Sequence, residues 1–295
     1  HFDTEIIIQF ILCKFKINEF PIPTYYGDEI SYVNGIKYAF NVIKESLVSQ
    51  ICKLGIFHIK KYDFKNIKYM SKVDFISTHS IAIKKIGYKE RIMDIGCSDG
   101  YLLKELYKKK SYIKGVDINV PKINIFNDFE KLDLDRRLPN DVSNFDTFLL
   151  LDIIEHLKYP EKFLINLNNK IKLNEKTKII ASTGNIAFIV IRFMLLLGYF
   201  NYGSRGILDM THTRLFTFKS FKKLFLDNGY EVKEIIGIPA PFSLAIGNNF
   251  FSKCLSIINL FLIKISKGLF SYQIMIIAKP KVNLDFLLKD SIKIN

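Results

Sequence analysis

The stretch "MDIGCSDG", residues Met93 to Gly100, decides the fold, because two incompatible interpretations of it predict different proteins. Its last five residues spell G-x-S-x-G, the turn in which a serine hydrolase of the α/β type presents its nucleophile. The same letters, placed directly after an apolar strand, are typical of a turn of small residues whose backbone approaches a nucleotide. Both interpretations put a strand before the turn and a helix after it, so both predict an α/β protein.

From Arg91 onward, short apolar runs alternate with helical stretches, which is the pattern of a mostly parallel sheet covered by helices. The predicted strands span 91–95, 112–117, 145–151, 178–182, 230–236 and 271–278. The predicted helices span 99–109, 160–171, 186–197, 218–228 and 250–267. Residues 250–267 have apolar side chains at helical spacing, and we expect that helix to face the core rather than a membrane surface.

The residues before Arg91 do not show this alternation of apolar runs and helical stretches. The segment "INEFPIPTYYGDEISYVNG" contains prolines, glycines and aromatics without clear periodicity, and a helix is predicted after it over 36–50. A second helix, 69–86, is expected to cap the α/β domain. We therefore predict three parts, namely a small extension over 1–65, an α/β domain over 66–281 and a tail over 282–295.

The composition argues against several classes of protein. The four cysteines, Cys13, Cys52, Cys97 and Cys254, lie far apart and no histidine pair has zinc spacing, so we expect a reducing compartment and no metal site. The longest apolar run, 186–197, is shorter than the ~20 residues that span a bilayer, so no transmembrane helix is expected. The net charge of +14 comes from lysines spread along the chain, so no nucleic-acid partner is expected. The first apolar stretch lacks the positive charge of a secretory signal, which predicts a cytoplasmic protein, with peripheral contact at the inner face of the membrane left open.

The hydrolase interpretation makes Ser98 a nucleophile and needs an acid and a histidine later in the chain. Asp152 or Asp209 with His212 would satisfy the order of a catalytic triad, so chain order alone leaves this alternative open. A hydrolase elbow, however, follows several strands and an oxyanion loop, whereas this turn follows the first strand of the domain. The position of the turn therefore favours nucleotide binding.

A carboxylate follows the second predicted strand, at the place where a nucleotide-binding fold holds the ribose. Asp117 comes 17 positions after Gly100, and its side chain can accept hydrogen bonds from both ribose hydroxyls. The dinucleotide pattern G-x-G-x-x-G is not met, since Ser98 and Tyr101 stand at its second and third glycine positions. A nicotinamide cofactor is therefore disfavoured.

Several motifs that occur in a fixed order resemble a known family. They are "DIGCSDG" at 94–100, the strand ending at Asp117, "FDTFLLLDIIEHLKYPEKFL" at 145–164, "ASTGN" at 181–185, "GILDMTHTRLFT" at 206–217 and "LDNGYEV" at 226–232. Together they resemble the class I S-adenosylmethionine-dependent methyltransferases, with a methyltransferase domain of the 23 or 11 type, over about residues 69 to 281. The resemblance implies a Rossmann-like, seven-stranded, mostly parallel sheet with helices on both faces, and S-adenosyl-L-methionine as the cofactor.

The resemblance also assigns residues to the cofactor. The cofactor-binding residues that it implies are Asp94, Gly96, Ser98, Gly100, Asp117, Asp133, Leu134 and Asp152. Asp117 would hold the ribose, and Asp133 would contact the adenine amino group with Leu134 flanking the ring. The alternative for Asp133 is a solvated loop carboxylate. Asp152 would border the methionine moiety, and Ser98 stands where the family more often has glycine, which alters the turn.

Methyl transfer to a hydroxyl is an in-line displacement, in which the protein mainly aligns the partners and a neutral imidazole can remove the acceptor proton. His156 and His212 are the predicted catalytic bases, because both lie in loops beside the ligand crevice of an open α/β sheet. Structural roles stay open for both, in helix packing for His156 and in a network with Asp209 and Arg214 for His212. Residues 186–202 are predicted to form a lid, with a plain core helix as the alternative.

The first 65 residues resemble a different family. The segments "HFDTEIIIQF" and "KINEFPIPTYYGDEISYVNGIKYAF" are similar to the end of a family 2 glycosyltransferase of the polyprenyl-phosphate sugar synthase type. This resemblance implies a glycan, glycolipid or other small acceptor, lipid-linked in some cases, in cell-surface polysaccharide assembly. We therefore expect an S-adenosylmethionine-dependent methyltransferase. The alternatives are a serine hydrolase that uses Ser98 and a non-catalytic scaffold with a degenerate cofactor fold. The oligomeric state is not predicted.

Overall fold

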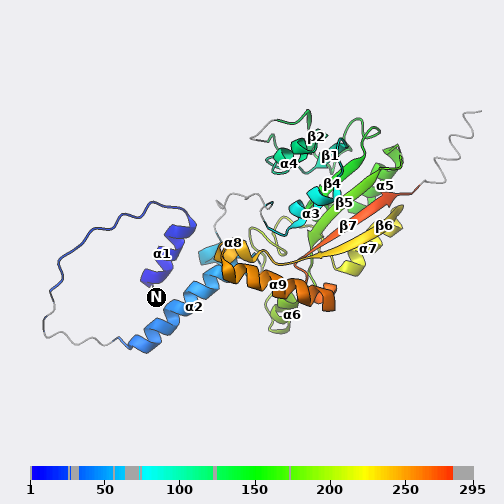
Figure 1. Ribbon diagram of the computed structural model, residues 1–295. Coiled ribbons are helices and arrows are strands. Elements are labelled where there is room, and N and C mark those ends of the chain that lie inside the picture. Colours follow the sequence, from blue (N-terminus) through cyan, green and yellow to red (C-terminus); the bar gives the residue numbers. More distant parts are fainter. Residues whose placement is uncertain are drawn as a thin grey trace, which may run out of the picture.

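The computed structural model describes residues 2–25, 27, 33–55, 57–63, 73, 75–121, 125–172 and 174–281. A seven-stranded sheet in the order β3-β2-β1-β4-β5-β7-β6 organises these residues (Figure 1). The strands are β1 (Arg91–Ile95), β2 (Tyr112–Asp117), β3 (Asp128–Lys131), β4 (Thr147–Leu151), β5 (Lys178–Gly184), β6 (Tyr230–Ile238) and β7 (Gln273–Pro280). Among them, β7 runs antiparallel to both of its neighbours, β5 and β6, and the other pairings are parallel. The predicted Rossmann-like, mostly parallel sheet is confirmed.

The strands form where the sequence has continuous apolar runs, because a strand in a parallel sheet is buried on both faces. All five residues of β4 are buried, and β1 and β2 begin and end at the predicted residues. The strand β3 is absent from the predicted set, because its sequence DFEK has no fully buried residue and lies at the edge of the sheet. The carboxyl ends of β1, β2, β4 and β5 meet at one edge, which is where a ligand binds in folds of this kind.

Helices cover both faces of the sheet. The α-helices are α1 (Phe2–Leu12), α2 (Gly35–Lys53), α3 (Thr78–Lys85), α4 (Leu103–Lys108), α5 (Pro160–Lys170), α6 (Ile189–Leu196), α7 (Phe218–Asp227), α8 (Phe242–Ile246), α9 (Phe250–Ile265) and α10 (Lys267–Phe270). One hydrophobic cluster packs α5 and α7 on the sheet through Leu164 and Phe225, and a second packs α3 through Ala82. Ile92 and Met93 of β1 belong to different clusters, so the two clusters lie on opposite faces.

The helix predicted to begin at residue 99 begins later, at Leu103. Gly100 has a φ of +76°, which lies outside the helical region, so the chain is still in the turn at that point. Of the predicted helix 69–86, only the second half is present as α3, because residues 75–77 are not helical and a capping box between Ser77 and Ser80 begins the helix at Thr78. Residues 65 and 69–72 lie outside the described residues, so the predicted boundary at 65 stays a prediction.

The prediction that the helix at 250–267 packs its apolar face on the core is wrong. Phe250 and Phe251 at the start of α9 are 75% and 72% exposed, whereas the buried residues of the helix are Ser252, Asn259 and Ile263. Asn259 is held by the backbone, because its Oδ1 accepts from Ala240 N and its Nδ2 donates to the carbonyl oxygen of Phe270, both at 2.9 Å. The helix therefore packs inward through Ser252, Asn259 and Ile263, and it presents most of its large apolar side chains outward.

The N-terminal helices α1 and α2 lie to one side of the sheet (Figure 1), and polar bonds tie the residues that follow α2 to the α/β part of the chain. The hydroxyl of Tyr272, just before β7, donates to the carbonyl oxygen of Leu54 at 2.9 Å. The amide of Ser204 donates to Asp63 Oδ2 at 3.0 Å. In addition, no helix in the described part of the chain combines the length and the apolarity needed to cross a bilayer.

Candidate functional site

The turn after β1 contains three left-handed residues in alternation. Gly96, Ser98 and Gly100 have φ angles of +80°, +49° and +76°. A Cβ added to Gly96 would lie 2.9 Å from Ile153 Cγ1, so both the backbone angle and the space require glycine there. The turn therefore presents bare backbone that a ligand can approach closely, as the nucleotide-binding interpretation predicts.

Ser98 is not placed as a hydrolytic nucleophile. The residue is exposed, and within the described part of the chain its side chain makes no hydrogen bond to a histidine or a carboxylate. The expected partners are engaged elsewhere, because His212 Nδ1 lies 3.0 Å from the carbonyl oxygen of Ile207, and Gln273 donates to Asp152 at 2.9 Å. The hydrolase alternative thus lacks the hydrogen bonds of a triad.

Asp117, the predicted ribose ligand, ends β2 beside the turn. Its Oδ2 accepts a hydrogen bond from the amide of Ser98 at 2.8 Å, and its Oδ1 accepts from the amide of Asn119 at 2.9 Å. Each carboxylate oxygen has a second lone pair, so each can still accept from a hydroxyl. Asp94 lies in β1 nearby, where burial and then the charge of Asp117 raise its pKa to about 7.

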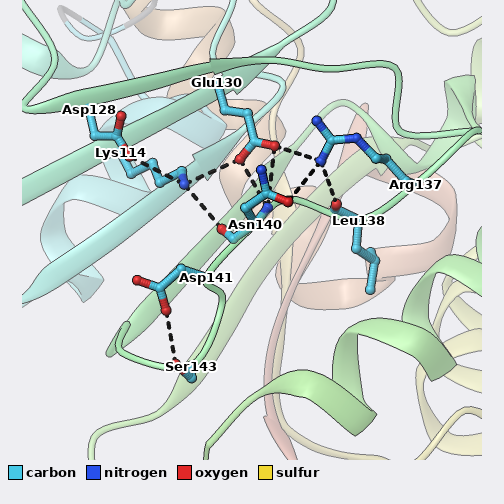
Figure 2. A network of polar contacts seen from close by, with 8 residues as sticks. All are labelled: Lys114, Asp128, Glu130, Arg137, Leu138, Asn140, Asp141 and Ser143. Carbon is cyan, nitrogen blue, oxygen red and sulfur yellow. Dashed lines mark hydrogen bonds and ion pairs between the residues drawn. The ribbon is translucent and has the colours of Figure 1, made fainter.

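A polar network fixes the edge strand β3 and the loop that follows it (Figure 2). Lys114 of β2 is almost buried, and its Nζ lies 3.2 Å from both Asp128 Oδ2 and Glu130 Oε2. Arg137 Nη1 lies 2.7 Å from Glu130 Oε1 and donates to Asn140 Oδ1 at 3.2 Å. The loop between β3 and Asn140 is therefore anchored at its start and at its end.

This anchored loop carries the predicted adenine contacts. Asp133 follows β3 directly, at the carboxyl end of the strand that neighbours Asp117, and the amide of Leu132 donates to the carbonyl oxygen of Asp117 at 2.8 Å. The Asp133 carboxylate also accepts from the amide of Asp135 at 3.0 Å. Leu134 packs against the core. The structure therefore brings Asp133 to the same edge of the sheet as the turn and Asp117.

Asp152 follows β4 and is held by the two strands beside it. Its φ of +54° is one that a non-glycine residue adopts only when the surroundings fix it. Its Oδ1 accepts from Ser182 Oγ at 2.6 Å, and Gln273 Nε2 lies 2.9 Å from each carboxylate oxygen. Because Ser182 belongs to β5 and Gln273 to β7, three neighbouring strands orient this carboxylate.

Glu155 brings a second carboxyl group close to Asp152, within the short 3-10 helix Ile154–His156. Its side chain is buried, and its Oε2 has no hydrogen-bond partner among the residues that the structure describes. Burial, and then the charge of Asp152, raise the pKa of Glu155 well above its ordinary value, which favours the protonated form near neutral pH. A ligand that bonds to Oε2 would satisfy the buried group.

The two predicted bases, His156 and His212, meet edge to face, with ring centroids 4.7 Å apart. The carbonyl oxygen of Ile207 can only accept, so the Nδ1 of His212 carries the proton and its Nε2 has the free lone pair when the ring is neutral. Burial, and then the nearby His156, lower the pKa of His212, which favours that neutral form. His156 Nδ1 lies 3.1 Å from Thr211 Oγ1 and 3.3 Å from the carbonyl oxygen of Thr211.

These acids and histidines line one cavity of about 460 Å³ at the carboxyl ends of β4 and β5. The polar residues of its wall include Asp152, Glu155, His156, Arg205, Asp209, His212 and Gln273. The apolar residues of its wall include Ile11, Leu12, Leu54, Ile207, Ile238, Pro239, Pro241 and Leu244. The lining does not include the described turn residues or Asp117, so the predicted site residues fall into two groups. Asp152 belongs to the group that lines the cavity.

The sequence does not point to three of these wall components. Glu155 is noticed only as the neighbour of His156, and Gln273 reaches Asp152 from a position 121 residues further along the chain. The N-terminal residues Ile11 and Leu12 belong to a segment that we predicted to be a separate extension. A charged residue directly before a predicted base, as in "EH", is the one local signal that could have identified Glu155.

Comparison with known proteins agrees with this geometry. Residues 65–235 match the family described as "Methyltransferase domain". Two curated relatives are the ubiquinone biosynthesis O-methyltransferases of Maricaulis maris, 28% identical over 92 residues, and of Nitrosococcus oceani, 23% identical over 99 residues. The matches cover 28% and 30% of this chain and 36% and 40% of those proteins, so the chain spans well under half of either relative.

Solved structures with a related fold include an S-adenosylmethionine-dependent methyltransferase from Archaeoglobus fulgidus. It is 21% identical, with a TM-score of 0.45, and the match covers 68% of this chain and 94% of that one. Another is the 1,6-didemethyltoxoflavin-N1-methyltransferase of Burkholderia thailandensis with bound S-adenosylhomocysteine. It is 11% identical, with a TM-score of 0.48, and the match covers 88% of this chain and 99% of that one.

The residues described above fit S-adenosyl-L-methionine. Gly96 keeps the backbone accessible at a position where a Cβ would clash with Ile153. The Asp117 carboxylate offers acceptors to ribose hydroxyls. The Asp152 carboxylate offers oxygens to an ammonium group, and the unpartnered Oε2 of Glu155 offers a further polar contact beside it. The family match extends over more than half of the chain and includes the turn, Asp117 and Asp152. The chain therefore belongs to the methyltransferase domain family, whose cofactor is S-adenosyl-L-methionine.

Proposed function

We propose that this chain transfers a methyl group from S-adenosylmethionine to a hydroxyl oxygen of an amphiphilic acceptor held in the cavity. The observation that carries the proposal is the state of His212 in the cavity wall. Its Nδ1–H donates a hydrogen bond to the carbonyl oxygen of Ile207, so its Nε2 lone pair is available to accept a proton. A neutral imidazole with a free lone pair is the group that a hydroxyl acceptor requires.

The reaction is a single displacement. S-adenosylmethionine, when bound, supplies a methyl group on positively charged sulfur. The acceptor oxygen would take that methyl group with S-adenosylhomocysteine as the leaving group, and His212 Nε2 would accept the proton of the acceptor hydroxyl. His156 is proposed as the residue that keeps His212 neutral, because its edge-to-face contact opposes a second positive charge. The apolar part of the cavity wall limits water at the reacting atoms.

The remaining predicted residues are proposed to hold the cofactor. Asp94, Gly96, Ser98 and Gly100 form the turn, and Asp117 accepts from the ribose hydroxyls. Asp133 is proposed to accept from the adenine amino group, with Leu134 against the ring, because β3 ends directly before them. Asp152 is proposed to bind the methionine moiety, since it lies where the cavity adjoins β4.

A lipid-linked acceptor is proposed from three observations that agree. The cavity has apolar walls from the N-terminal helix α1 and from the residues after β6, with Arg205 as a cationic group. The two curated relatives are named for ubiquinone biosynthesis, and the N-terminal segment resembles the end of a polyprenyl-phosphate sugar synthase. We place the acceptor hydroxyl either on a lipid-linked sugar, as in cell-surface polysaccharide or glycolipid assembly, or on a lipid-linked ring.

The acceptor class can be tested with S-adenosylmethionine that carries a radioactive methyl group. The enzyme is incubated with a bacterial lipid extract and, separately, with a water-soluble polysaccharide fraction. Label that enters the organic phase supports a lipid-linked acceptor, and mild acid hydrolysis of that product separates sugar-bound from ring-bound methyl. Label confined to the polysaccharide would contradict the acceptor proposal but not methyl transfer itself.

The role of His212 has its own test. His212→Gln should lower kcat by about 100-fold or more, the ordinary contribution of a general base, and should leave the Kd for S-adenosylmethionine unchanged. His156→Gln, the matched variant, should shift the pH dependence of kcat instead of abolishing turnover. Parent-like turnover in His212→Gln would remove the base. The absence of any calorimetric signal for S-adenosylmethionine with the parent protein would favour the scaffold alternative.

A further inference from the structure

The helix α9 is amphipathic, but it buries mainly polar side chains and exposes large apolar ones. Its inward stripe contains Ser252 and Asn259, whose side chains bond to backbone groups, and it buries one large apolar residue, Ile263. Its outward surface is apolar and includes Phe250, Phe251, Ile257, Ile258, Phe261 and Ile265, each more than half exposed. A helix that turns its large apolar side chains away from its own core has a surface suited to another apolar phase.

The helix α6 adds to this surface at the same end of the molecule (Figure 1). Ile191 and Met194 are buried, whereas Phe193, Leu196 and Leu197 are 58%, 79% and 70% exposed. Both helices border one hydrophobic cluster, because Ala240, which bonds to Asn259 of α9, packs in the cluster that contains the buried residues of α6. We call the exposed apolar residues of α9 and α6 the α9/α6 face.

Within the two segments that carry the α9/α6 face, the charged residues have one sign. The segment 239–272 contains three lysines, Lys253, Lys264 and Lys267, and no aspartate or glutamate. The segment 186–206 contains Arg192 and Arg205, and again no acidic residue. An apolar helix surface whose own segment carries lysines and no acidic residue is the combination that binds the interface of an anionic bilayer.

We propose that the α9/α6 face docks on the surface of a membrane that contains anionic phospholipid, with α9 lying in the interfacial plane. This contact goes beyond the proposed methyl transfer and does not depend on it. A second copy of the chain is a poorer occupant, because a two-fold contact would set lysines against the same lysines without an acidic partner. A bilayer covers the aromatic side chains and neutralises the lysines together.

The docking would also bring the cavity close to the lipid. Pro239, Pro241 and Leu244 line the cavity in the segment that precedes α9, and Ile207 lines it eleven residues after the end of α6. The same short segments therefore carry both the cavity wall and the α9/α6 face. An acceptor anchored in the membrane would then meet the cavity without leaving the interface.

The test is co-sedimentation of the full chain with vesicles of phosphatidylcholine alone and with vesicles that also contain phosphatidylglycerol. The parent protein should sediment with the anionic vesicles, and added salt should reduce the binding. The variant Phe250→Ser with Phe251→Ser should bind at least about tenfold more weakly, because exposed aromatic area that the bilayer covers is lost. The variant Lys253→Glu with Lys264→Glu should lose most of the preference for anionic lipid.

Two controls make the result specific to this face. Tyr88→Ser removes an aromatic side chain that is 75% exposed on the loop before β1, and Lys219→Glu with Lys222→Glu makes the same change of charge on α7. Both controls should sediment like the parent. Equal binding by the parent and the Phe250/Phe251 variant, or a parent that stays in solution, would overturn the proposal. So would a dimer that dissociates in the Phe250/Phe251 variant, since it would make the face a contact between copies.

Discussion

The substitution Gly96→Ala tests whether the turn after β1 is built for a ligand. Two independent costs arise at this position. The φ of +80° is unfavourable for alanine by about 1–2 kcal/mol. The added Cβ would lie 2.9 Å and 3.0 Å from Cγ1 and Cδ1 of Ile153, and overpacking of this kind costs about 1–3 kcal/mol. The two together predict a loss of about 2–5 kcal/mol in the free energy of unfolding.

The structure offers a matched control in Gly198, which follows α6. Its φ is +78°, nearly the same, but an added Cβ there would have nothing within 4 Å. Gly198→Ala should therefore show only the backbone cost of about 1–2 kcal/mol. The difference between the two variants isolates the contact with Ile153. The double variant Gly96→Ala with Ile153→Ala should recover part of that difference, because two of the three close atoms are removed.

Urea unfolding and calorimetric titration of S-adenosylmethionine give the two readouts. Gly96→Ala should weaken cofactor binding at least about tenfold, because Ile153 or the turn must move and the Ser98 amide bonded to Asp117 moves with it. Gly198→Ala should bind the cofactor like the parent. If Gly96→Ala bound with the parent Kd and unfolded within about 0.5 kcal/mol of Gly198→Ala, the reasoning about this turn would be refuted.

Three further substitutions have defined outcomes. Asp117→Ala should weaken S-adenosylmethionine binding by at least tenfold in calorimetry, since each charge-assisted bond to the ribose contributes about 1.5–3 kcal/mol, and an unchanged Kd would remove that assignment. The raised pKa of Asp94, about 7 against an ordinary 3.8, means that the folded protein keeps a proton that the unfolded chain releases, so stability should fall as pH rises from 3.8 to 7. Asp94→Asn should remove up to about 1.4 kcal/mol per pH unit from that slope, which urea unfolding at several pH values would measure, and equal slopes would contradict it. Tyr230→Phe should lower the free energy of unfolding by about 1–3 kcal/mol, because the buried carbonyl oxygen of Leu164 loses its 2.7 Å bond to the hydroxyl, while the Kd for the cofactor stays the same.

The parts of the fold that the sequence predicts well are those in which one local pattern decides the structure. The strands β1 and β2 are apolar runs bounded by polar residues, and both were predicted to the residue. The strand β3 was missed because none of its four residues is buried, and its position depends on Lys114 of the neighbouring strand. The start of α4 was misplaced because Gly100 keeps the chain in a left-handed turn, which the letter G alone does not reveal.

The candidate site likewise contains residues that local sequence patterns predict and residues that only long-range packing places. The turn and Asp117 are set by strand ends, so their proximity follows from the order of the strands. The acid Glu155 and the amide of Gln273 are set by packing between distant segments, because β7 enters the sheet between β5 and β6 and brings Gln273 to Asp152. The inverted orientation of α9 is also a long-range effect. Asn259 faces inward because Ala240 and Phe270, on either side of it in sequence, provide its partners.

The contacts of the N-terminal segment differ from those of the separate extension that its sequence resemblance suggests. Ile11 and Leu12 line the cavity, and Leu54 and Asp63 receive hydrogen bonds from Tyr272 and from Ser204. If the segment had no role in the site, we would expect the α/β domain to form the whole cavity wall by itself. Instead, the N-terminal segment supplies part of that wall. We infer that the segment completes the acceptor side of the site, whereas the turn after β1 and Asp117 serve the cofactor side. On this division, residues outside the part of the chain that matches the family contribute to the acceptor side of the site.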